Sequence, residues 1–469
     1  MVSATASIHH RHGHTAILLA MCLGVFIAQL DSQVVNLAVK QIGSDLGAGI
    51  SQLQWVLDSY NVFYATLLLT GGTLGDLYGR TRVFAIGIAL IVVGSLVCAA
   101  APNSAALITG RAITGVGAAL EVPTSLAILT VTYTDAKERA SAIGVWAGCN
   151  GLALAVGPTI GGLLVDAAGW RSIFALVVPI SVLAMAMAIR TVPESRDAQG
   201  RRLDLRGQVL VIIALAALSF VTIEGPHEGF ASPAILALIA VFIVSSALFL
   251  VSQRNRAGAL VPLDVFRNAP FDAALAVAGM MTFGMYAMLF LTPLYLQTLG
   301  KFSAFIVGLQ LLPLSATFVA VSHYSGALAK RFGPRGVMAT GMGAMGIGLL
   351  LLTQITSVPN MALLAAALFI IGVGLGLNTG PVNAVAVASL PPFRSGTASG
   401  LVNTSRMIGA TLGVAVLGAM FAVRAAGNSP DAMVSGLRAA YLGGAIVEIA
   451  GALIALAFIR SDSMEQRSK

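Results

Sequence analysis

Six charged side chains stand inside stretches of sequence that are otherwise apolar. They are Asp31, Asp58, Arg111, Glu121, Arg406 and Glu448. A bare charge near the centre of a bilayer costs from about 2.5 kcal/mol upward, so such residues persist mainly where they face a partner or an aqueous cavity. Because burial disfavours the charged form, an intramembrane carboxylate can take up a proton and later lose it to solvent or to a cationic substrate. That competition can exchange protons against a cation; a structural salt bridge is the alternative for each residue.

The composition indicates that most of the chain lies in lipid. Of its 469 residues, 57% are hydrophobic and 10% charged, whereas soluble domains are about 45–50% apolar and about 25% charged. These values exclude a soluble enzyme, a secreted disulfide scaffold and a disordered protein. The net charge of +8 is explained by basic cytoplasmic loops rather than by nucleic-acid binding. We expect membrane lipid around the chain, and no metal, cofactor, nucleic acid or protein partner.

The apolar runs predict an all-α, polytopic membrane protein. Each crossing takes about 20 apolar residues, and the runs are continuous rather than alternating, which excludes a barrel. Fourteen spans are expected, near residues 15–38, 51–73, 83–101, 104–132, 141–166, 172–190, 207–224, 231–252, 271–297, 303–327, 335–356, 360–388, 396–423 and 438–459. Short connections leave no room for a large soluble domain.

The distribution of basic residues predicts the orientation. With a cytoplasmic N-terminus, 20 Lys and Arg residues fall in cytoplasmic loops and tails, five fall outside, and Arg111 and Arg406 remain within the membrane. This bias agrees with the rule that cytoplasmic loops are the basic ones. The expected location is therefore the cell membrane, with both termini cytoplasmic.

A short basic turn occurs twice, as Gly72 to Arg80 after the second span and as Gly326 to Arg335 after the tenth. Such internal similarity is typical of a duplicated transporter with its site between the halves. The expected organisation is a cytoplasmic tail (1–14), a six-helix bundle (15–190), a cytoplasmic linker (191–206), two additional helices (207–252), a second cytoplasmic linker (253–270), a second six-helix bundle (271–459) and a cytoplasmic tail (460–469).

Several motifs follow one another along almost the whole chain, at residues 30–36, 55–60, 72–82, 111–117, 157–162 and 403–409. In this order they resemble the fourteen-helix drug:proton antiporter branch of the major facilitator superfamily. The resemblance implies two six-helix bundles plus two extra helices, which rock about a central cavity to give alternating access.

Four residues are expected to couple protons to a cationic substrate: Asp31, Asp58, Arg111 and Glu121. The resemblance supports Asp31 and Asp58, and it implies that Arg111 assists proton transfer. Arg111 and Glu121 are ten residues apart, about 15 Å along one helix, so the partner of Arg111 must lie on another helix. Glu121 departs from the family pattern, and an added carboxylate near the centre of the membrane would favour the binding of cationic substrates.

Further polar residues are candidates for the cavity wall. At about 100° per residue, Gln29, Gln33 and Asn36 share one helix face, and Asp31 points nearly the other way. Either face could line the cavity. The other candidates are Tyr60, Asn378, Asn383, Asn403, Arg406 and Glu448.

Two glycine-containing motifs are expected to serve the conformational change. The turn with Gly72, Asp76, Gly79, Arg80 and Arg82 resembles the family's cytoplasmic latch, because Gly79 permits a tight reversal and Asp76 can hold basic groups. A solvated turn is the alternative. The resemblance also identifies the set Gly157, Pro158, Gly161 and Gly162 as an antiporter-type motif, although plain helix packing explains the glycines too.

The sequence thus predicts a secondary transporter, not an enzyme, that exports lipophilic, cationic drugs or dyes in exchange for protons. A bacterial multidrug efflux antiporter that confers antibiotic resistance fits this description. One alternative is a narrower transporter, namely an exporter of one endogenous metabolite or antibiotic, or an importer. The other is a membrane sensor or enzyme, but the chain has no effector domain or catalytic motif and lacks a nucleotide-binding loop.

Overall fold

The computed structural model describes residues 2–197, 203–254, 259–391, 394–425 and 429–459. Every regular element in these residues is helical. The helices are α1 (Val2–Leu46), α2 (Ile50–Tyr78), α3 (Arg80–Ala99), α4 (Ser104–Thr132), α5 (Ala136–Ala168), α6 (Arg171–Thr191), α7 (Leu205–Glu228), α8 (Pro233–Gln253), η1 (Leu263–Arg267), α9 (Ala269–Thr298), α10 (Ala304–Gln310), α11 (Leu312–Phe332), α12 (Pro334–Leu352), α13 (Met361–Ala388), α14 (Ser395–Ala425) and α15 (Pro430–Phe458).

The prediction of an all-α polytopic membrane protein is confirmed. Within the described residues, 13 helices are long and apolar enough to cross a membrane, with α10 and α11 taken together as one span. The remaining long helix, α2, is less apolar because it carries Gln52, Gln54, Asp58 and Asn61. With α2 included, the described part of the chain has the fourteen long helices that the apolar runs predict.

Some boundaries differ from those expected. Helix α1 already begins at Val2, so the expected tail at 1–14 is continuous with the first span. The tenth expected span is interrupted at Leu311, because Pro313 in the first turn of α11 cannot donate the backbone hydrogen bond that would continue α10. The expected tail at 460–469 lies outside the described residues, as do residues 198–202 and 255–258 of the two expected linkers.

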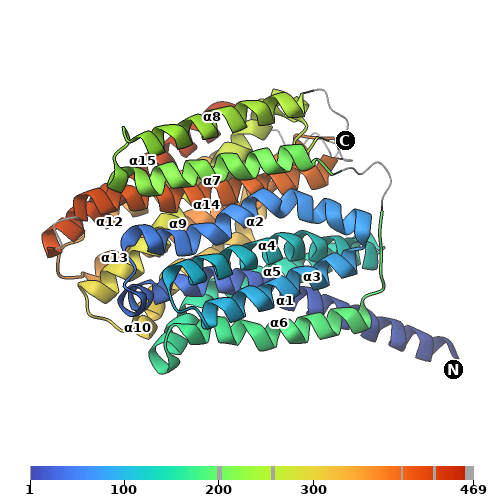
Figure 1. Cartoon of the computed structure of the whole chain (residues 1–469). Coiled ribbons are helices and arrows are strands. Elements are labelled where there is room, and N and C mark those ends of the chain that lie inside the picture. The colour runs from blue at the N-terminus through green and yellow to red at the C-terminus, as the bar shows by residue number, and fades with distance from the viewer. Residues whose placement is uncertain (1, 198–202, 255–258, 392–393, 426–428, 460–469) are drawn as a thin grey trace.

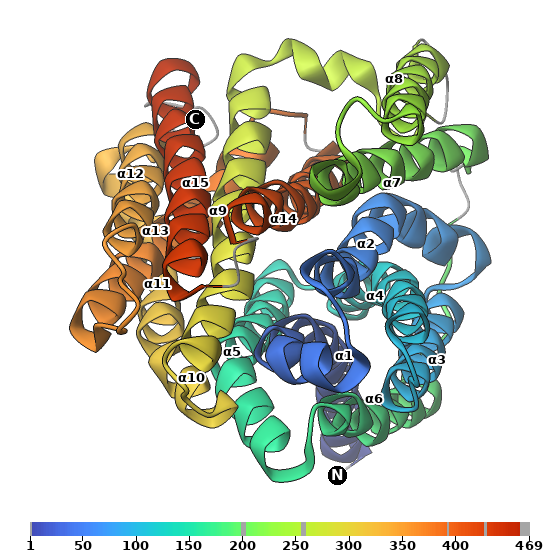
Figure 2. The same cartoon turned by 60° about the vertical axis from the view of Figure 1, so that its left-hand side comes forward.

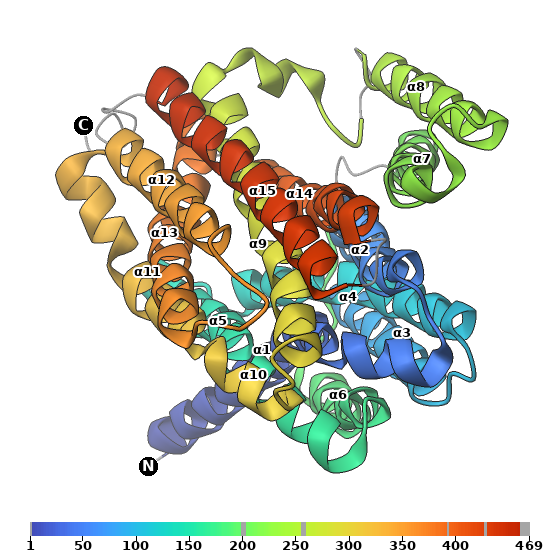
Figure 3. The same cartoon turned by 90° about the vertical axis from the view of Figure 1, so that its left-hand side faces the viewer.

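The long helices form two groups with an additional pair at their side (Figure 2). Helices α1 to α6 pack mainly on one another, and α9 to α15 do the same. The groups meet through α2 against α14, α5 against α10 and α11, and α1 against α9. Helix α7 lies beside α2 and α14, and α8 packs on α7 at the periphery (Figures 2 and 3). We call the two groups the front half and the back half.

Two ends of the bundle are used below as references. The Gly79 end holds the α2–α3 turn and the start of α1, and the Lys40 end holds the end of α1 and the start of α2. An even number of crossings brings the end of α15 to the Gly79 end, where the N-terminus also lies (Figure 1).

Helix α7 is attached to α2 near both of its ends. Near the Gly79 end, Gln208 donates to the carbonyl of Thr66 at 2.8 Å and also hydrogen-bonds Thr70. Near the Lys40 end, Glu224 accepts from Trp55 at 3.0 Å and from Ser51 at 2.7 Å. These buried and half-buried polar contacts fix the additional pair to the front half.

Candidate functional site

A cavity of about 150 Å³ lies where the two halves meet. Helices α1, α2, α4 and α5 of the front half form its wall together with α9, α11, α13 and α14 of the back half. The lining residues are Val25, Ala28, Gln29, Ser32, Tyr60, Tyr64, Val122, Asn150, Leu154, Met281, Thr282, Met285, Tyr286, Phe318, Leu375, Thr379, Asn403, Arg406 and Met407. A site shared by two halves is one that their relative motion can expose to alternate ends.

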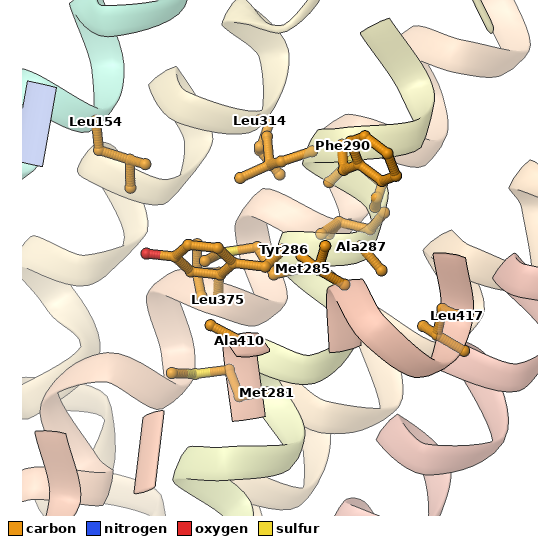
Figure 4. Packing of buried hydrophobic residues seen from close by; sticks show 14 of the residues in the cluster. Leu154, Met281, Met285, Tyr286, Ala287, Phe290, Leu314, Leu375, Ala410 and Leu417 are labelled. Carbon is orange, nitrogen blue, oxygen red and sulfur yellow. The ribbon is translucent and has the colours of Figure 1, made fainter. Parts of the chain in front are cut away.

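Tyr286 of α9 crosses the boundary between the halves. Its hydroxyl faces Gln29, Ser32 and Gln33 of α1, and the side chain is only 8% exposed. Figure 4 shows the ring extending from α9 toward the side from which Leu154 of α5 enters, with Met281 and Leu375 nearby. The hydroxyl is therefore a polar group in a mostly apolar wall, reached from both halves.

Arg406 of α14 is another polar group on the cavity wall. Its Nη2 donates to the carbonyl of Thr379 on α13 at 3.2 Å. Its Nε is buried and has no hydrogen-bond partner among the described residues. The backbone carbonyl of Arg406 accepts from Thr282 of α9 at 2.6 Å, which fixes this turn of α14 against α9.

A buried ion pair stands behind the front wall of the cavity. Arg111 of α4 donates to the carboxylate of Asp31 on α1, and each side chain is 1% exposed. Arg111 also donates to the carbonyl of Val56 at 3.2 Å, and its guanidinium lies 4.6 Å from the ring centre of Tyr60. Because Tyr60 itself lines the cavity, the pair is separated from a bound molecule by one aromatic ring.

Asp58 lies in the seam between the halves. Its neighbour one turn earlier on α2, Gln54, donates to the carbonyls of Val414 and Ala415 on α14, at 2.9 and 3.2 Å. Asp58 lies one turn further along α2, closer to the Gly79 end, between the face that meets α14 through Gln54 and the face that meets α7 through Trp55. The Asp58 carboxyl and the Thr411 hydroxyl are both buried without a hydrogen-bond partner among the described residues.

Two further buried carboxyls each pack against a glycine within one half. Glu121 of α4 lies against Gly24 of α1 and Gly87 of α3, and Glu448 of α15 lies against Gly284 of α9. Both are fully buried, and neither makes a hydrogen bond within the described part of the chain. Gly24 and Gly284 leave the space that each carboxyl occupies, since a Cβ added at either glycine would collide with a carboxyl oxygen.

Several predicted cavity residues lie elsewhere. Gln29, Tyr60, Asn403 and Arg406 line the cavity. Gln33, Asn36, Asn378, Asn383 and Glu448 are not among its lining residues.

The reason is local in each case. Gln33 packs against Gly157 of α5, and Asn378 packs against Gly341 of α12. Asn36 and Asn383 donate to carbonyls of their own helices, and Glu448 lies behind α9, in the core of the back half.

Helical periodicity gives the faces of a helix but does not say which neighbour covers each face. Four lining residues, Tyr64, Tyr286, Phe318 and Thr379, are therefore not predictable from the sequence, because they are ordinary residues for a membrane span.

The halves are joined at the Lys40 end. Lys40 donates to the carbonyl of Gln297 at 2.6 Å, and the Gln297 amide donates to the carbonyl of Leu37 at 2.9 Å. Asp166 at the end of α5 accepts from the backbone N–H groups of Ala304 and Phe305, at 3.0 and 2.8 Å, where α10 begins. A carboxylate at a helix N-terminus is favourably placed.

The Gly157–Gly162 segment of α5 lies in the same seam. Gly161 lies against Val34 of α1, and Gly162 approaches the backbone of Ala304 on α10 so closely that a side chain would not fit. Gly308 of α10 approaches the carbonyl of Pro158 in the same way. These small residues let α5 contact both halves near the Lys40 end.

The halves are less closely packed toward the Gly79 end. Helix α5 has no buried residue from 143 to 152, and a side chain added at Gly144 or Gly148 would meet no atom within 4 Å. On the facing helix α11, Tyr324 is 62% exposed. The cavity is therefore closed at one end by hydrogen bonds and tight packing. At the other end α5 is only half-buried, and Trp146 attaches it to α4 by donating to Ser125 at 3.1 Å.

The turn at Gly79 is fastened within the front half. Gly79 has a φ of 113°, which glycine adopts without strain, and Asp76 pairs with Arg80 at 2.8 Å. Glu194, which follows α6, accepts from the backbone N–H groups of Thr81 and Arg82, both at 3.1 Å, and so caps α3. Gly72 faces Pro123 of α4.

Two halves of membrane-spanning helices around a shared cavity define a multi-pass membrane transporter of the duplicated type. The profile of the Major Facilitator Superfamily matches residues 21–414. The chain belongs to this superfamily, and it is a transporter rather than an enzyme.

Its relatives include efflux and resistance proteins. Multidrug resistance protein Stp of Mycobacterium tuberculosis is 38% identical over 405 residues, covering 86% of this chain and 75% of Stp. The methylenomycin A resistance protein of Bacillus subtilis is 34% identical and covers 86% of each chain. Among solved structures, a bacterial homologue of the lysosomal transporter Spinster superposes with a TM-score of 0.71 at 16% identity, covering 97% of this chain and 98% of that one.

Proposed function

We propose that this transporter exports small lipophilic molecules, of the kind handled by its multidrug and antibiotic resistance relatives, in exchange for protons. The observation that carries the proposal is the cavity between the halves, closed at the Lys40 end, with the buried Asp31–Arg111 pair directly behind its wall. The distribution of basic residues supports a cytoplasmic Gly79 end in the cell membrane. In that orientation the described conformation faces the cytoplasm, where export begins.

The motion required is a rocking of the halves about the cavity. Opening at the Lys40 end has to break the Lys40–Gln297 and Asp166–α10 contacts and separate the tightly packed Gly162 from Ala304. The first half of α5, which is only half-buried, can then close toward α11. Because α7 is fastened to α2, the α7–α8 pair moves with the front half.

Protons enter the mechanism through the buried carboxyls. An ionised carboxylate buried without a partner costs several kcal/mol, so Asp58 and Glu121 are suited to carry a proton, whereas Asp31 keeps its charge through Arg111. Protonation of Asp31 would release Arg111, which contacts α2 through Val56 and Tyr60. Protonation of this one carboxylate would therefore change how α1, α2 and α4 pack on one another next to the substrate.

The test uses the purified full-length protein in liposomes that contain the pH indicator pyranine. Ethidium, para-tert-butylbenzamide and para-tert-butylbenzoate are added separately, with protein-free liposomes as the control for passive leakage. We expect at least one compound to drive a proton flux that Asp31→Asn abolishes. The matched control Asp45→Asn removes the same charge from the exposed end of α1 and should transport normally. If none of the compounds moves protons, the proposed exchange is wrong.

A further inference from the structure

The cavity carries one charged side chain among its lining residues, all of which lie in the described part of the chain, and that residue is Arg406. The sequence favours a cationic substrate because it contains Asp31, Asp58 and Glu121. None of these three carboxyls lines the cavity. Asp31 is neutralised by Arg111. Asp58 and Glu121 are fully buried, Glu121 against α1 and α3. A bound molecule therefore meets a positive charge first.

The guanidinium of Arg406 is incompletely satisfied by the protein. It carries five N–H donors in a rigid fork, and one bond from Nη2 to Thr379 is formed at 3.2 Å. Its Nε is buried without a partner among the described residues. A buried donor without an acceptor is unfavourable, and an anionic ligand in the cavity would supply the acceptor.

Neutral hydrogen-bonding groups and apolar side chains complete the wall. Gln29, Ser32 and Tyr286 meet at the boundary of the halves, and Asn403 lies on the same helix as Arg406. The rest of the surface is dominated by apolar and aromatic side chains, including Met281, Met285, Tyr64, Phe318 and Leu375. A cavity of about 150 Å³ accommodates an apolar group of about the size of one benzene ring.

We propose that the cavity selects small lipophilic carboxylates, whose charged group binds Arg406. This inference rests on the proposed export function, because it names the substrate class of the same site. A planar carboxylate can accept two parallel N–H bonds from a guanidinium, which adds geometric selectivity to the charge attraction. The apolar part of the ligand then lies against the methionine and aromatic side chains.

The test measures binding alone, so that it does not depend on proton coupling. The full-length protein in lipid nanodiscs is titrated calorimetrically with three compounds of the same shape, with empty nanodiscs as the blank. They are para-tert-butylbenzoate, the neutral para-tert-butylbenzamide and the cationic para-tert-butylbenzylammonium. The variants are Arg406→Gln, Arg406→Lys and Arg424→Gln. Arg424→Gln is the matched control, because Arg424 lies exposed on the same helix.

We expect the wild-type protein to bind the benzoate about ten- to a hundredfold more tightly than the benzylammonium, the range of a charge-assisted hydrogen bond. Arg406→Gln should remove this preference while leaving the affinity for the benzamide unchanged. Arg406→Lys should keep part of the preference for the benzoate, because the positive charge remains but the paired N–H donors of the guanidinium are lost. Arg424→Gln should bind all three compounds like the wild type.

The inference is overturned if the cation binds as tightly as the benzoate, if Arg406→Gln leaves benzoate binding unchanged, or if the wild type binds none of the three. If Arg406→Gln also loses affinity for the benzamide, that variant is misfolded. The inference is then decided by the wild-type preference for the benzoate over the benzylammonium and by how much of it Arg406→Lys keeps. Benzoate binding without any proton flux in liposomes would contradict the proposed exchange but leave the anion site standing.

Discussion

Removal of the charge of Asp31 should destabilise the front half strongly, because it leaves Arg111 charged and buried. Both side chains are 1% exposed, and breaking a buried pair by removing one partner costs about 3–5 kcal/mol. The carbonyl of Val56 and the ring of Tyr60 remain as partners of Arg111, so we expect the lower part of this range for Asp31→Asn. That corresponds to roughly a hundredfold change in the unfolding equilibrium.

The measurement is a double-mutant cycle of the free energy of unfolding in mixed micelles. The double variant Asp31→Asn, Arg111→Gln buries no unpaired charge and should recover about 2 kcal/mol relative to the single variant. The control is Asp45 with Arg171, 3.7 Å apart and about 45% exposed, where a surface pair contributes less than about 1 kcal/mol. If Asp31→Asn destabilises no more than Asp45→Asn, the pair does not hold α1 to α4 and our account of the coupling is refuted.

Three further substitutions test the seams around the cavity. Gly162→Leu should force α5 away from α10 and shift the population toward a conformation open at the Lys40 end. Distances between spin labels across that end measure the shift. The control Gly148→Leu, in open space on the same helix, should leave these distances unchanged. Glu194→Gln removes the charge that caps α3 and should cost about 1 kcal/mol in unfolding free energy; an unchanged value would contradict the capping role. Glu224→Ala should loosen α7 from α2 and raise hydrogen exchange in the facing turns near Trp55, whereas unchanged protection would show that apolar packing alone holds the pair.

The candidate site could be predicted only in part. Asp31 and Arg111 stand out because charges inside apolar runs need a partner. Glu121, the carboxyl on the same helix as Arg111, is ten residues away and is therefore too distant to pair with it. Glu121 carries the same signal, yet it packs against Gly24 and Gly87 instead of facing the cavity. Tyr286 gives no signal, since an aromatic residue in an apolar span fits lipid, protein core and cavity equally well.

Local composition and motifs are enough to establish the surrounding lipid, the secondary structure and the superfamily of this chain. Apolar runs of about 20 residues have to satisfy their backbone groups within each helix when water is absent, so the number and type of elements follow from local composition. Which face of each helix meets lipid, a neighbour or the cavity depends on pairings between segments hundreds of residues apart, such as Gln54 with Val414. The positions of the carboxyls behind the cavity wall and of Arg406 on it follow from how the helices pack, because local composition fixes a helix but not its neighbours.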